Sequence, residues 1–260
     1  MRCDFKQCKQ EEIIDFMQEY ICTLQSPFDS FLEEHILKST FYMINFNEEV
    51  VGYYGIFKDD LLTQFYIKVP LYNKSKEIFE EIISNHPITS IFVPTSDEFL
   101  LSSVIDQDYK INKQAYFFQD SKIPIPQEKL YNSGQFRKAV LSDVEKILEV
   151  SHDFLDRLEE RIDEGQIFVF IKENILLGVG LIERSILQEG YASVGMFTNE
   201  NYRRHGIGRT IIHHLKQWCY SNNLTPICGC WYYNINSKLT LESAGMVTKT
   251  RLLNIQVEKK

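Results

Sequence analysis

One short segment of the chain combines arginines with glycines, and it reads Arg203-Arg204-His205-Gly206-Ile207-Gly208. Glycine lets the backbone turn tightly and approach a ligand without a clashing Cβ atom. Apolar residues then recur at helical spacing up to Trp218, which predicts an amphipathic helix. Because the first turn of a helix presents unpaired N–H groups and the positive end of its dipole, the segment predicts an anion-binding site, and a diphosphate suits it.

The same segment also fits an ordinary strand–helix turn with two solvated arginines, so its context matters. Tyr191–Thr198 has the pattern of a strand directly before the loop, and Thr225–Trp231 predicts a strand after the helix. A further helix is expected from about Asn234 to Ser243, with Gly245 as its stop. The loop therefore connects the end of a strand to the start of a helix, which is a common place for anion binding.

The other elements of the second half follow from periodicity and turn residues. A strand is expected at Phe136–Val140, then a helix opened by a capping box of Ser142 and Glu145. A second helix ends at Gly165, and a hairpin and the elements above follow. Two closing strands are expected to run to Val257. The predicted order is β-α-α-β-β-β-α-β-α-β-β, an α+β (α/β mixed sheet) fold.

These features together resemble the GNAT superfamily of acyl-CoA N-acyltransferases. That family's diphosphate loop reads Arg/Gln-x-x-Gly-x-Gly/Ala, which Arg203 to Gly208 matches at each fixed position. The family's Asn-x-x-Ala/Ser and Gly-Phe signatures are similar to Asn234-x-x-Ser237 and Gly245-Met246. The resemblance covers about residues 136–257, and within it the chain is loosely similar to acetyltransferases of the zwittermicin-resistance type.

The resemblance implies transfer of an acetyl group from acetyl-CoA, as co-substrate, to an amine by direct attack. N–H groups of residues 204–209 would hold the CoA diphosphate, and the pantetheine arm would pair like a strand with Met196–Thr198. An N–H near Phe197 or Thr198 would stabilise the oxyanion. Asn234 would hydrogen-bond the pantetheine or cap its helix. The implied cofactor-binding residues are Met196, Phe197, Thr198, Arg203, Arg204, His205, Gly206, Ile207, Gly208, Arg209, Asn234 and Ser237.

The acid and base of the reaction are harder to assign. Where the family often has a proton-donating Tyr, this chain has Leu241, and the strand Tyr191–Thr198 lacks the family's frequent Glu. A base would still help, because a free amine is mostly protonated near pH 7. Tyr232 and Tyr233 are the preferred catalytic candidates, with Ser237 near the sulfur. The other candidates, each of which also suits a structural role, are Glu183, Glu189 and His152.

The pattern of the first half indicates a degenerate copy of the second half. Gly52 lies in a predicted hairpin as Gly178 does, and Thr89 starts a predicted strand as Thr225 does. The glycine loop has no counterpart, because Val69-Pro70-Leu71-Tyr72-Asn73 stands there and proline lacks an N–H. We expect a degenerate GNAT-like domain that shapes the acceptor site at residues 1–120, a linker at 121–135 and a catalytic GNAT domain at 136–260.

Composition limits the class of protein. The net charge of −8 argues against nucleic acid as a partner, and no stretch is long and apolar enough for a membrane span, so a cytoplasmic protein is expected. Residues 1–130 carry 12 Lys and Arg against 21 Asp and Glu, or −9, whereas the rest carries 16 against 15, or +1. The six cysteines show no zinc spacing, so reduced thiols and no metal are expected, although a catalytic Cys230 stays open.

The leading hypothesis is an N-acetyltransferase for a small amine acceptor. A tandem aminoacyl transferase of the cell-wall type also resembles two GNAT domains, but the intact loop and the short chain disfavour it. A non-catalytic acyl-CoA-binding sensor is the third hypothesis, because the usual Tyr and Glu are missing. The sequence leaves a homodimer open.

Overall fold

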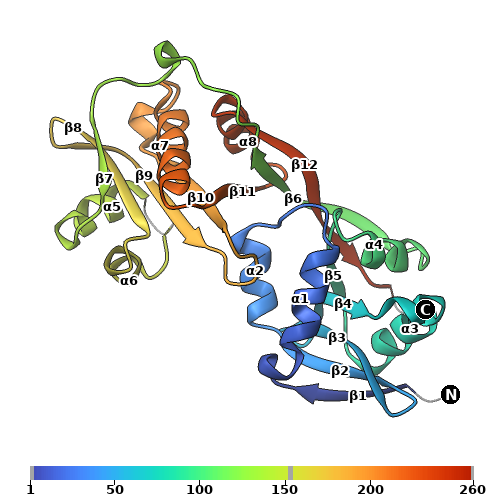
Figure 1. Cartoon of the computed structure of the whole chain (residues 1–260). Coiled ribbons are helices and arrows are strands. Elements are labelled where there is room, and N and C mark those ends of the chain that lie inside the picture. Colours follow the sequence, from blue (N-terminus) through green and yellow to red (C-terminus); the bar gives the residue numbers. More distant parts are fainter. Residues whose placement is uncertain (1–2, 152–154, 259–260) are drawn as a thin grey trace. The chain divides into compact units, whose positions relative to one another are not determined.

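The computed structural model describes residues 3–151 and 155–258, and it divides the chain into two compact units (Figure 1). Unit 1 contains the described residues up to Phe117 and those from Thr250 onward. Unit 2 extends from Phe118 to Lys249. His152, which the sequence analysis considered, lies outside the described residues.

Unit 1 combines helices with a sheet whose strand order is β1-β2-β3-β4-β5-β12, in which β12 (Met246–Gln256) is followed by β6. Its elements are β1 (Cys3–Cys8), α1 (Ile14–Thr23), α2 (Ser30–Leu37), β2 (Thr40–Phe46), β3 (Glu49–Phe57), β4 (Leu61–Ile67), the 3-10 segment η2 (Val69–Lys74), α3 (Ser75–Asn85), β5 (Ser90–Pro94), α4 (Glu98–Ile105) and β6 (Lys110–Asp120). Strands β1 to β4 are antiparallel neighbours, and β4 and β5 are parallel.

The two sides of this sheet are covered by different helices (Figure 1). Ile78, Phe79 and Ile82 of α3 join Leu100 of α4 in the core on one face. On the other face, the ring of Tyr20 of α1 lies 6.5 Å from that of Tyr53 of β3. The alternation of Tyr53 and Tyr54 along β3 explains how one strand supplies both cores.

Unit 2 repeats this plan with strand order β7-β8-β9-β10-β11. Its elements are β7 (Gln135–Lys138), α5 (Val144–Ser151), α6 (Leu158–Asp163), β8 (Ile167–Lys172), β9 (Ile175–Arg184), β10 (Tyr191–Thr198), the 3-10 segment η6 (Glu200–Tyr202), α7 (Ile207–Ser221), β11 (Thr225–Trp231) and α8 (Ile235–Ser243), followed by β12 (Met246–Gln256). Helices α5 and α6 pack on one face of β8 and β9 through Ile147, Leu158 and Val179.

Helix α7 lies on the other face, close to β9 (Figure 1). A Cβ atom at Gly178 would lie 2.7 Å from the side chain of Ile211 and 2.5 Å from the carbonyl oxygen of Phe197. Only glycine allows both contacts, because real Cβ atoms do not approach other atoms so closely. Gly178 therefore fixes where β10 and α7 meet.

Strands β10 and β11 and the hairpin of β8 and β9 confirm the sequence-based expectations, but three others were wrong or incomplete. The two closing strands are one, β12, which begins in unit 2 and pairs antiparallel with β5 of unit 1 over Leu252–Gln256. Strand β1 was not anticipated. At the start of the α5 region, the bond formed is from the Val140 N–H to the Asp143 carboxylate (2.9 Å) rather than the expected capping box of Ser142 and Glu145.

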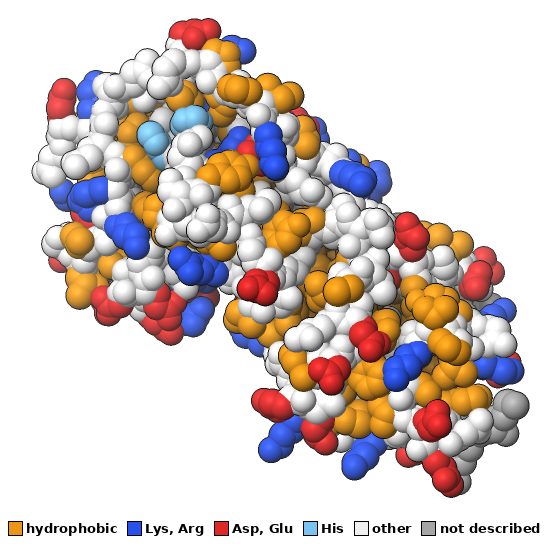
Figure 2. Space-filling model, in the orientation of Figure 1, with side chains coloured by type: hydrophobic (Ala, Val, Ile, Leu, Met, Phe, Trp, Pro, Cys, Tyr) orange, Lys and Arg blue, Asp and Glu red, His pale blue; other side chains and the backbone are white. Residues whose placement is uncertain are grey.

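Two general expectations can be compared with the structure. None of the helices formed by the described residues has the length and apolar character needed to cross a bilayer. On the face shown in Figure 2, acidic and basic side chains are interspersed over each unit. The charge difference between the halves is therefore not displayed there as a surface of one sign.

Candidate functional site

Near the carboxyl end of β10, this strand separates from its neighbour β11. Strands β10 and β11 pair in parallel at Tyr191–Ser193 with Thr225–Ile227, while β10 continues to Thr198 and β11 to Trp231. The two strands part beyond this register, and α7 and α8 begin after their carboxyl ends. Ligands of mixed α/β sheets commonly bind at such a parting of strands.

The segment between β10 and α7 has the backbone shape of an anion cradle. Arg204 and Gly206 both adopt left-handed conformations, with φ of +67° and +80°. Such conformations turn successive N–H groups toward one point. Helix α7 begins at Ile207, and within the described structure no side chain caps it. Its first N–H groups are therefore available to a ligand.

Gly208 brings three elements of the site together. A Cβ atom there would lie 2.9 Å from Thr240 Cγ2 of α8, 3.1 Å from Thr198 Oγ1 and 3.4 Å from Met196 Sδ of β10. The first turn of α7 thus reaches the end of β10 and one side of α8 directly. The structure places Met196, Thr198 and Gly208, three of the predicted cofactor-binding residues, next to one another, and their contact with a donor stays a prediction.

The basic side chains near the loop differ in what they contact. Arg203 Nη2 lies 2.9 Å from Glu200 Oε1, and its guanidinium lies over the ring of Phe197 at 5.7 Å. Arg204 and His205 are exposed. Arg209 donates to the carbonyl of Lys129 (2.9 Å) and to Ser243 Oγ (3.1 Å). Arg209 therefore has a clear structural role beside the expected one in binding.

Residues 129–131 lie against the start of α7, which the sequence analysis missed. The N–H of Tyr131 donates to Thr210 Oγ1 at 2.8 Å, and Thr210 Oγ1 also donates to the Gly206 carbonyl at 3.0 Å. This part of the expected linker is thus attached to the loop. Nothing in its local sequence announces this contact, because both bonds use backbone groups.

Asn234 caps helix α8, since its Oδ1 accepts the N–H of Ser237 at 3.0 Å. Tyr232 and Tyr233 lie in the turn between β11 and α8, with ring centroids 5.2 Å apart. Tyr233 also contacts Trp231 at 5.2 Å, and both are more than half exposed. The cap explains the conformation of Asn234, and its contact with a donor stays a prediction.

The remaining acid and base candidates occupy different surroundings. Glu183 of β9 accepts a hydrogen bond from Arg161 Nη1 at 2.8 Å, and Arg161 also holds Asp156. This ion pair raises the pKa of Arg161 and gives Glu183 a structural partner. Glu189 is exposed. Leu241, at the family's tyrosine position, is buried.

Unit 1 carries a counterpart of this site with a different chemistry. Gly52 pairs with Ile67 at the end of β4 as Gly178 pairs with Thr198 at the end of β10. Strands β4 and β5 pair in parallel only at Leu61 and Leu62 before they part. Helix α4 is capped by Asp97, whose Oδ1 accepts the N–H of Leu100, so Asp97 takes the place that Asn234 has in unit 2.

Comparison with known proteins agrees with this repetition. The model of an acetyltransferase (GNAT) domain matches residues 9–121, and that of the acetyltransferase (GNAT) family matches residues 136–245. No curated protein sequence matches the chain significantly.

Several solved structures share the fold over nearly the whole chain. A GNAT-family acetyltransferase from Colwellia psychrerythraea is 17% identical, with a TM-score of 0.87 and coverage of 98% of this chain and 100% of that one. A GCN5-related N-acetyltransferase from Sphaerobacter thermophilus is 10% identical, with a TM-score of 0.66 and coverage of 98% and 95%.

A tandem GNAT protein from the clavulanic acid biosynthesis pathway is 8% identical, with a TM-score of 0.60 and coverage of 99% and 98%. At these identities the likeness concerns the fold. The two family models and the repeated architecture show that the chain belongs to the GNAT superfamily and consists of two GNAT domains in tandem.

Proposed function

We propose that unit 2 is an N-acetyltransferase that moves an acetyl group from acetyl-CoA to the amine of a small molecule. The observation that carries the proposal is the uncapped start of α7 beside the parted strands β10 and β11. An anionic ligand at this point would satisfy the N–H groups that helix geometry leaves unpaired. In members of the GNAT family, the anionic ligand is acyl-CoA.

The residues around the ends of β10 and β11 suit the diphosphate, the pantetheine and the thioester of acetyl-CoA in turn. Left-handed backbone at Arg204 and Gly206 directs N–H groups toward the diphosphate, and exposed Arg204 adds positive charge. The end of β10, from Met196 to Thr198, offers a strand edge to the pantetheine. An N–H near Phe197 or Thr198 would stabilise the oxyanion that forms when the amine attacks.

Proton transfer is assigned to the turn between β11 and α8. Tyr232 and Tyr233 lie directly before Asn234, whose cap fixes the start of α8. A phenol there can donate a proton to the departing thiolate. Glu183 is disfavoured as the base, because it is bonded to Arg161.

The experiment is turnover by the full chain, with acetyl-CoA and a panel of primary amines that ranges from monoamines to diamines and amino sugars. Release of free CoA together with an acetylated amine, detected by mass spectrometry, is the expected result. Tyr232→Phe and Tyr233→Phe are compared separately. The variant that loses the proton-donating hydroxyl should have a lower kcat and a changed pH profile of kcat, with little change in acetyl-CoA affinity. Binding of acetyl-CoA without an acetylated product from any amine would contradict the proposal.

A second candidate is a non-catalytic acyl-CoA sensor. Two observations favour it, namely the buried Leu241 at the family's tyrosine position and the engagement of Glu183 by Arg161. The same binding site would serve both functions, so affinity does not separate them. Turnover separates them. A sensor would bind acetyl-CoA but acetylate no amine, whether as the parent protein, as Tyr232→Phe or as Tyr233→Phe.

A further inference from the structure

The segment that connects the two GNAT domains passes one end of α7 (Figure 1). Its residues 127–131, which we call the strap, lie between the two ranges that the family models match, and they begin with the 3-10 turn η3 (Gln127–Lys129). Leu130 is only 9% exposed, and the ring of Tyr131 lies 6.0 Å from that of Phe170 in β8, edge to face. The strap is therefore anchored on unit 2.

Two hydrogen bonds in series connect the strap to the backbone before α7. The N–H of Tyr131 donates to Thr210 Oγ1 at 2.8 Å, and Thr210 Oγ1 donates to the Gly206 carbonyl at 3.0 Å. A hydroxyl has a single proton, so the bond from Tyr131 leaves that proton for Gly206. Because Thr210 is only 1% exposed, water competes little with this relay.

The relay ends on the peptide group that joins the anion cradle to α7. The Gly206 carbonyl also accepts the N–H of Thr210 at 3.0 Å. In a trans peptide the carbonyl and the following N–H lie in one plane and point in opposite directions. A Gly206 carbonyl held on the helix side therefore turns the N–H of Ile207 away from the helix, toward the place proposed for the diphosphate. Glycine at φ +80° has no Cβ atom to restrict this rotation, so the orientation depends on such contacts.

A second contact joins the strap to the first turn of α7. Arg209 Nη1 donates to the Lys129 carbonyl at 2.9 Å, and Arg209 Nε donates to Ser243 Oγ of α8 at 3.1 Å. The strap and α8 thus hold the guanidinium from two sides. A guanidinium has five N–H donors, so Arg209 keeps others for a phosphate while these contacts fix its position.

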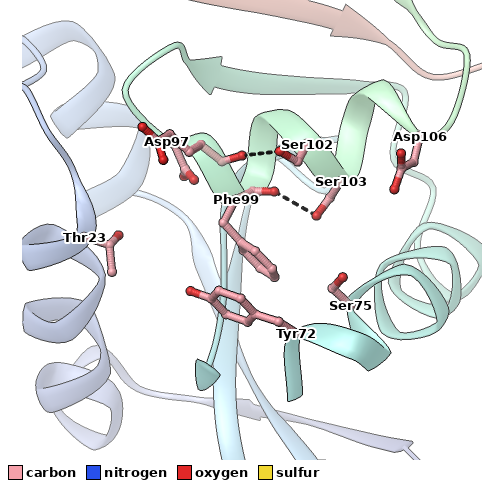
Figure 3. A pocket seen from close by; sticks show the side chains of 9 residues that line it. Thr23, Tyr72, Ser75, Asp97, Phe99, Ser102, Ser103 and Asp106 are labelled. Carbon is pink, nitrogen blue, oxygen red and sulfur yellow. Dashed lines mark hydrogen bonds between the residues drawn. The ribbon is translucent and has the colours of Figure 1, made fainter. Parts of the chain in front are cut away.

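In unit 1 the segment before the corresponding helix, α3, is held differently. Tyr72 of η2 stacks on Phe99 of α4 with ring centroids 4.3 Å apart (Figure 3). A contact inside the domain thus joins the segment before α3 to α4. In unit 2 the corresponding connection between α7 and α8 includes Arg209, which is bonded to the strap as well.

We propose that the strap positions the donor site of unit 2 and acts through Thr210, so that docking of the strap and binding of acyl-CoA strengthen each other. The inference rests on the function proposed for unit 2 only in that acyl-CoA is the ligand at the start of α7. Coupling of this kind is reciprocal, because both events stabilise one arrangement of the loop. Since the strap belongs to the covalent connection between the domains, occupancy of the donor site also holds that connection in place.

The test compares two substitutions at one position by calorimetric titration of the full chain with acetyl-CoA. Tyr131→Pro removes the backbone N–H, whereas Tyr131→Ala keeps it, and both remove the ring. Leu130 has φ −86° and ψ 149°, an extended conformation that suits a residue before proline. Tyr131→Pro should bind acetyl-CoA about 5- to 10-fold more weakly than Tyr131→Ala, because the relay is broken.

Thr210→Val breaks the same relay from the helix side and should weaken the affinity by a similar factor. Thr210→Ser keeps the hydroxyl and should stay within about 2-fold of the parent. Thr210→Val combined with Tyr131→Pro should lose little more than either alone, since both remove one interaction. Thr63→Val is the matched control. Thr63 of unit 1 is buried and its hydroxyl donates to the Gly55 carbonyl at 3.1 Å, so this change should lower stability and leave acetyl-CoA affinity unaltered.

The reciprocal effect is measured by hydrogen exchange of residues 127–131, which should slow when acetyl-CoA is added. Three results would overturn the inference: equal acetyl-CoA affinities of folded Tyr131→Pro and Tyr131→Ala, losses that add in the combined variant, or exchange that acetyl-CoA does not change. A parent protein that binds no acetyl-CoA would refute both proposals. Coupled binding without any acetylated amine would refute only the function proposed for unit 2.

Discussion

Helix α7 in unit 2 and helix α3 in unit 1 follow corresponding strands, β10 and β4, but they begin differently. The segment before α7 contains Arg204 and Gly206 in left-handed conformations, and α7 is uncapped. The segment before α3 is the 3-10 turn η2, which contains Pro70 and places Tyr72 against Phe99 of α4. Neither helix has a side-chain cap, so the two copies differ in what precedes the helix: a left-handed loop in unit 2, and a 3-10 turn with an aromatic stack in unit 1.

The capping residues of the following helices differ in the same sense. Asn234 and Asp97 make the same hydrogen bond to the third residue of their helices. Asn234 is exposed and neutral, whereas Asp97 is buried and acidic. The two copies thus share the backbone role of this position, whereas the charge and the burial of its side chain differ.

The largest expected difference between the two units is the effect of charge reversal, in the loop before α7 or before α3, on acetyl-CoA affinity. Arg203→Glu with Arg204→Glu should weaken acetyl-CoA binding at least ~100-fold, because attraction to the diphosphate becomes repulsion. Lys68→Glu with Lys74→Glu in unit 1 is the matched control and should leave the affinity within about 2-fold. Calorimetry measures both, and an equal loss in the two double variants would show that the loops do not differ in the way described.

The buried carboxylate of unit 1 should make stability fall with rising pH, whereas Asp143 and Asp156 of unit 2 have lowered pKa values and should give the opposite trend. The pKa of Asp97 is about 6 in the folded protein and near 3.8 in a free chain, so the folded state binds more protons between these values. Stability should therefore fall as pH rises from about 4 through 6, and Asp97→Asn should be more stable than the parent at pH 7.5 by about 3 kcal/mol.

Urea unfolding of both proteins at pH 4.5 and 7.5 measures this difference, and the comparison of the two cancels the titration of other carboxylates. Tyr20 and Tyr53 face Asp97 but stay neutral over this range, since their pKa values are raised well above 10. A constant difference between parent and variant at the two pH values would show that Asp97 titrates normally.

A matched pair of glycines tests the loop backbone itself. Gly206 and Gly190 have nearly equal φ angles, +80° and +81°, so alanine at either should introduce a similar strain of about 1 kcal/mol. Gly206→Ala should also weaken acetyl-CoA binding by about 10-fold, because the cradle must shift. Gly190, with no atom within 4 Å of its added Cβ, should show only the strain. Equal affinities in the two variants would remove Gly206 from the binding site.

The cap of α8 should give the smallest effect. Asn234→Ala should lower stability by about 1 kcal/mol through loss of the cap, whereas Asn234→Asp should preserve it. If Asn234 also contacts the pantetheine, both variants should lower kcat/KM. Melting temperature and turnover are recorded together, and an Asn234→Asp protein with parental turnover would restrict this residue to capping.

Local sequence was sufficient for the elements that frame the opening of unit 2. Strands β10 and β11 were predicted with their observed bounds, because alternating apolar residues and clear turn residues define them. The repeat was visible through Gly52 and Gly178, and their corresponding contacts with β4 and β10 give it a physical basis.

Features that depend on distant contacts were not predictable in this way. The burial of Asp97 results from packing against Tyr20, Tyr53 and Gln64, which are far away in sequence, and its local pattern only indicates a helix cap. The contact of Tyr131 with Thr210 uses a backbone N–H that any residue would supply. The continuous β12 was divided in the sequence analysis because the pattern does not show that its second part pairs with β5.

The course of β12 has a consequence for how the protein is made. The N–H of Arg251 donates to Thr95 Oγ1, that of Val257 donates to the carbonyl of Thr89, and Leu252–Gln256 pair with β5. The residues of unit 1 up to Phe117 are synthesised before unit 2, yet the edge of β5 is completed only by residues synthesised after unit 2. Domains usually fold in order of synthesis. Here the first part of unit 1 must wait until unit 2 and the second part of β12 have been synthesised, with an unpaired strand edge exposed to aggregation in the meantime.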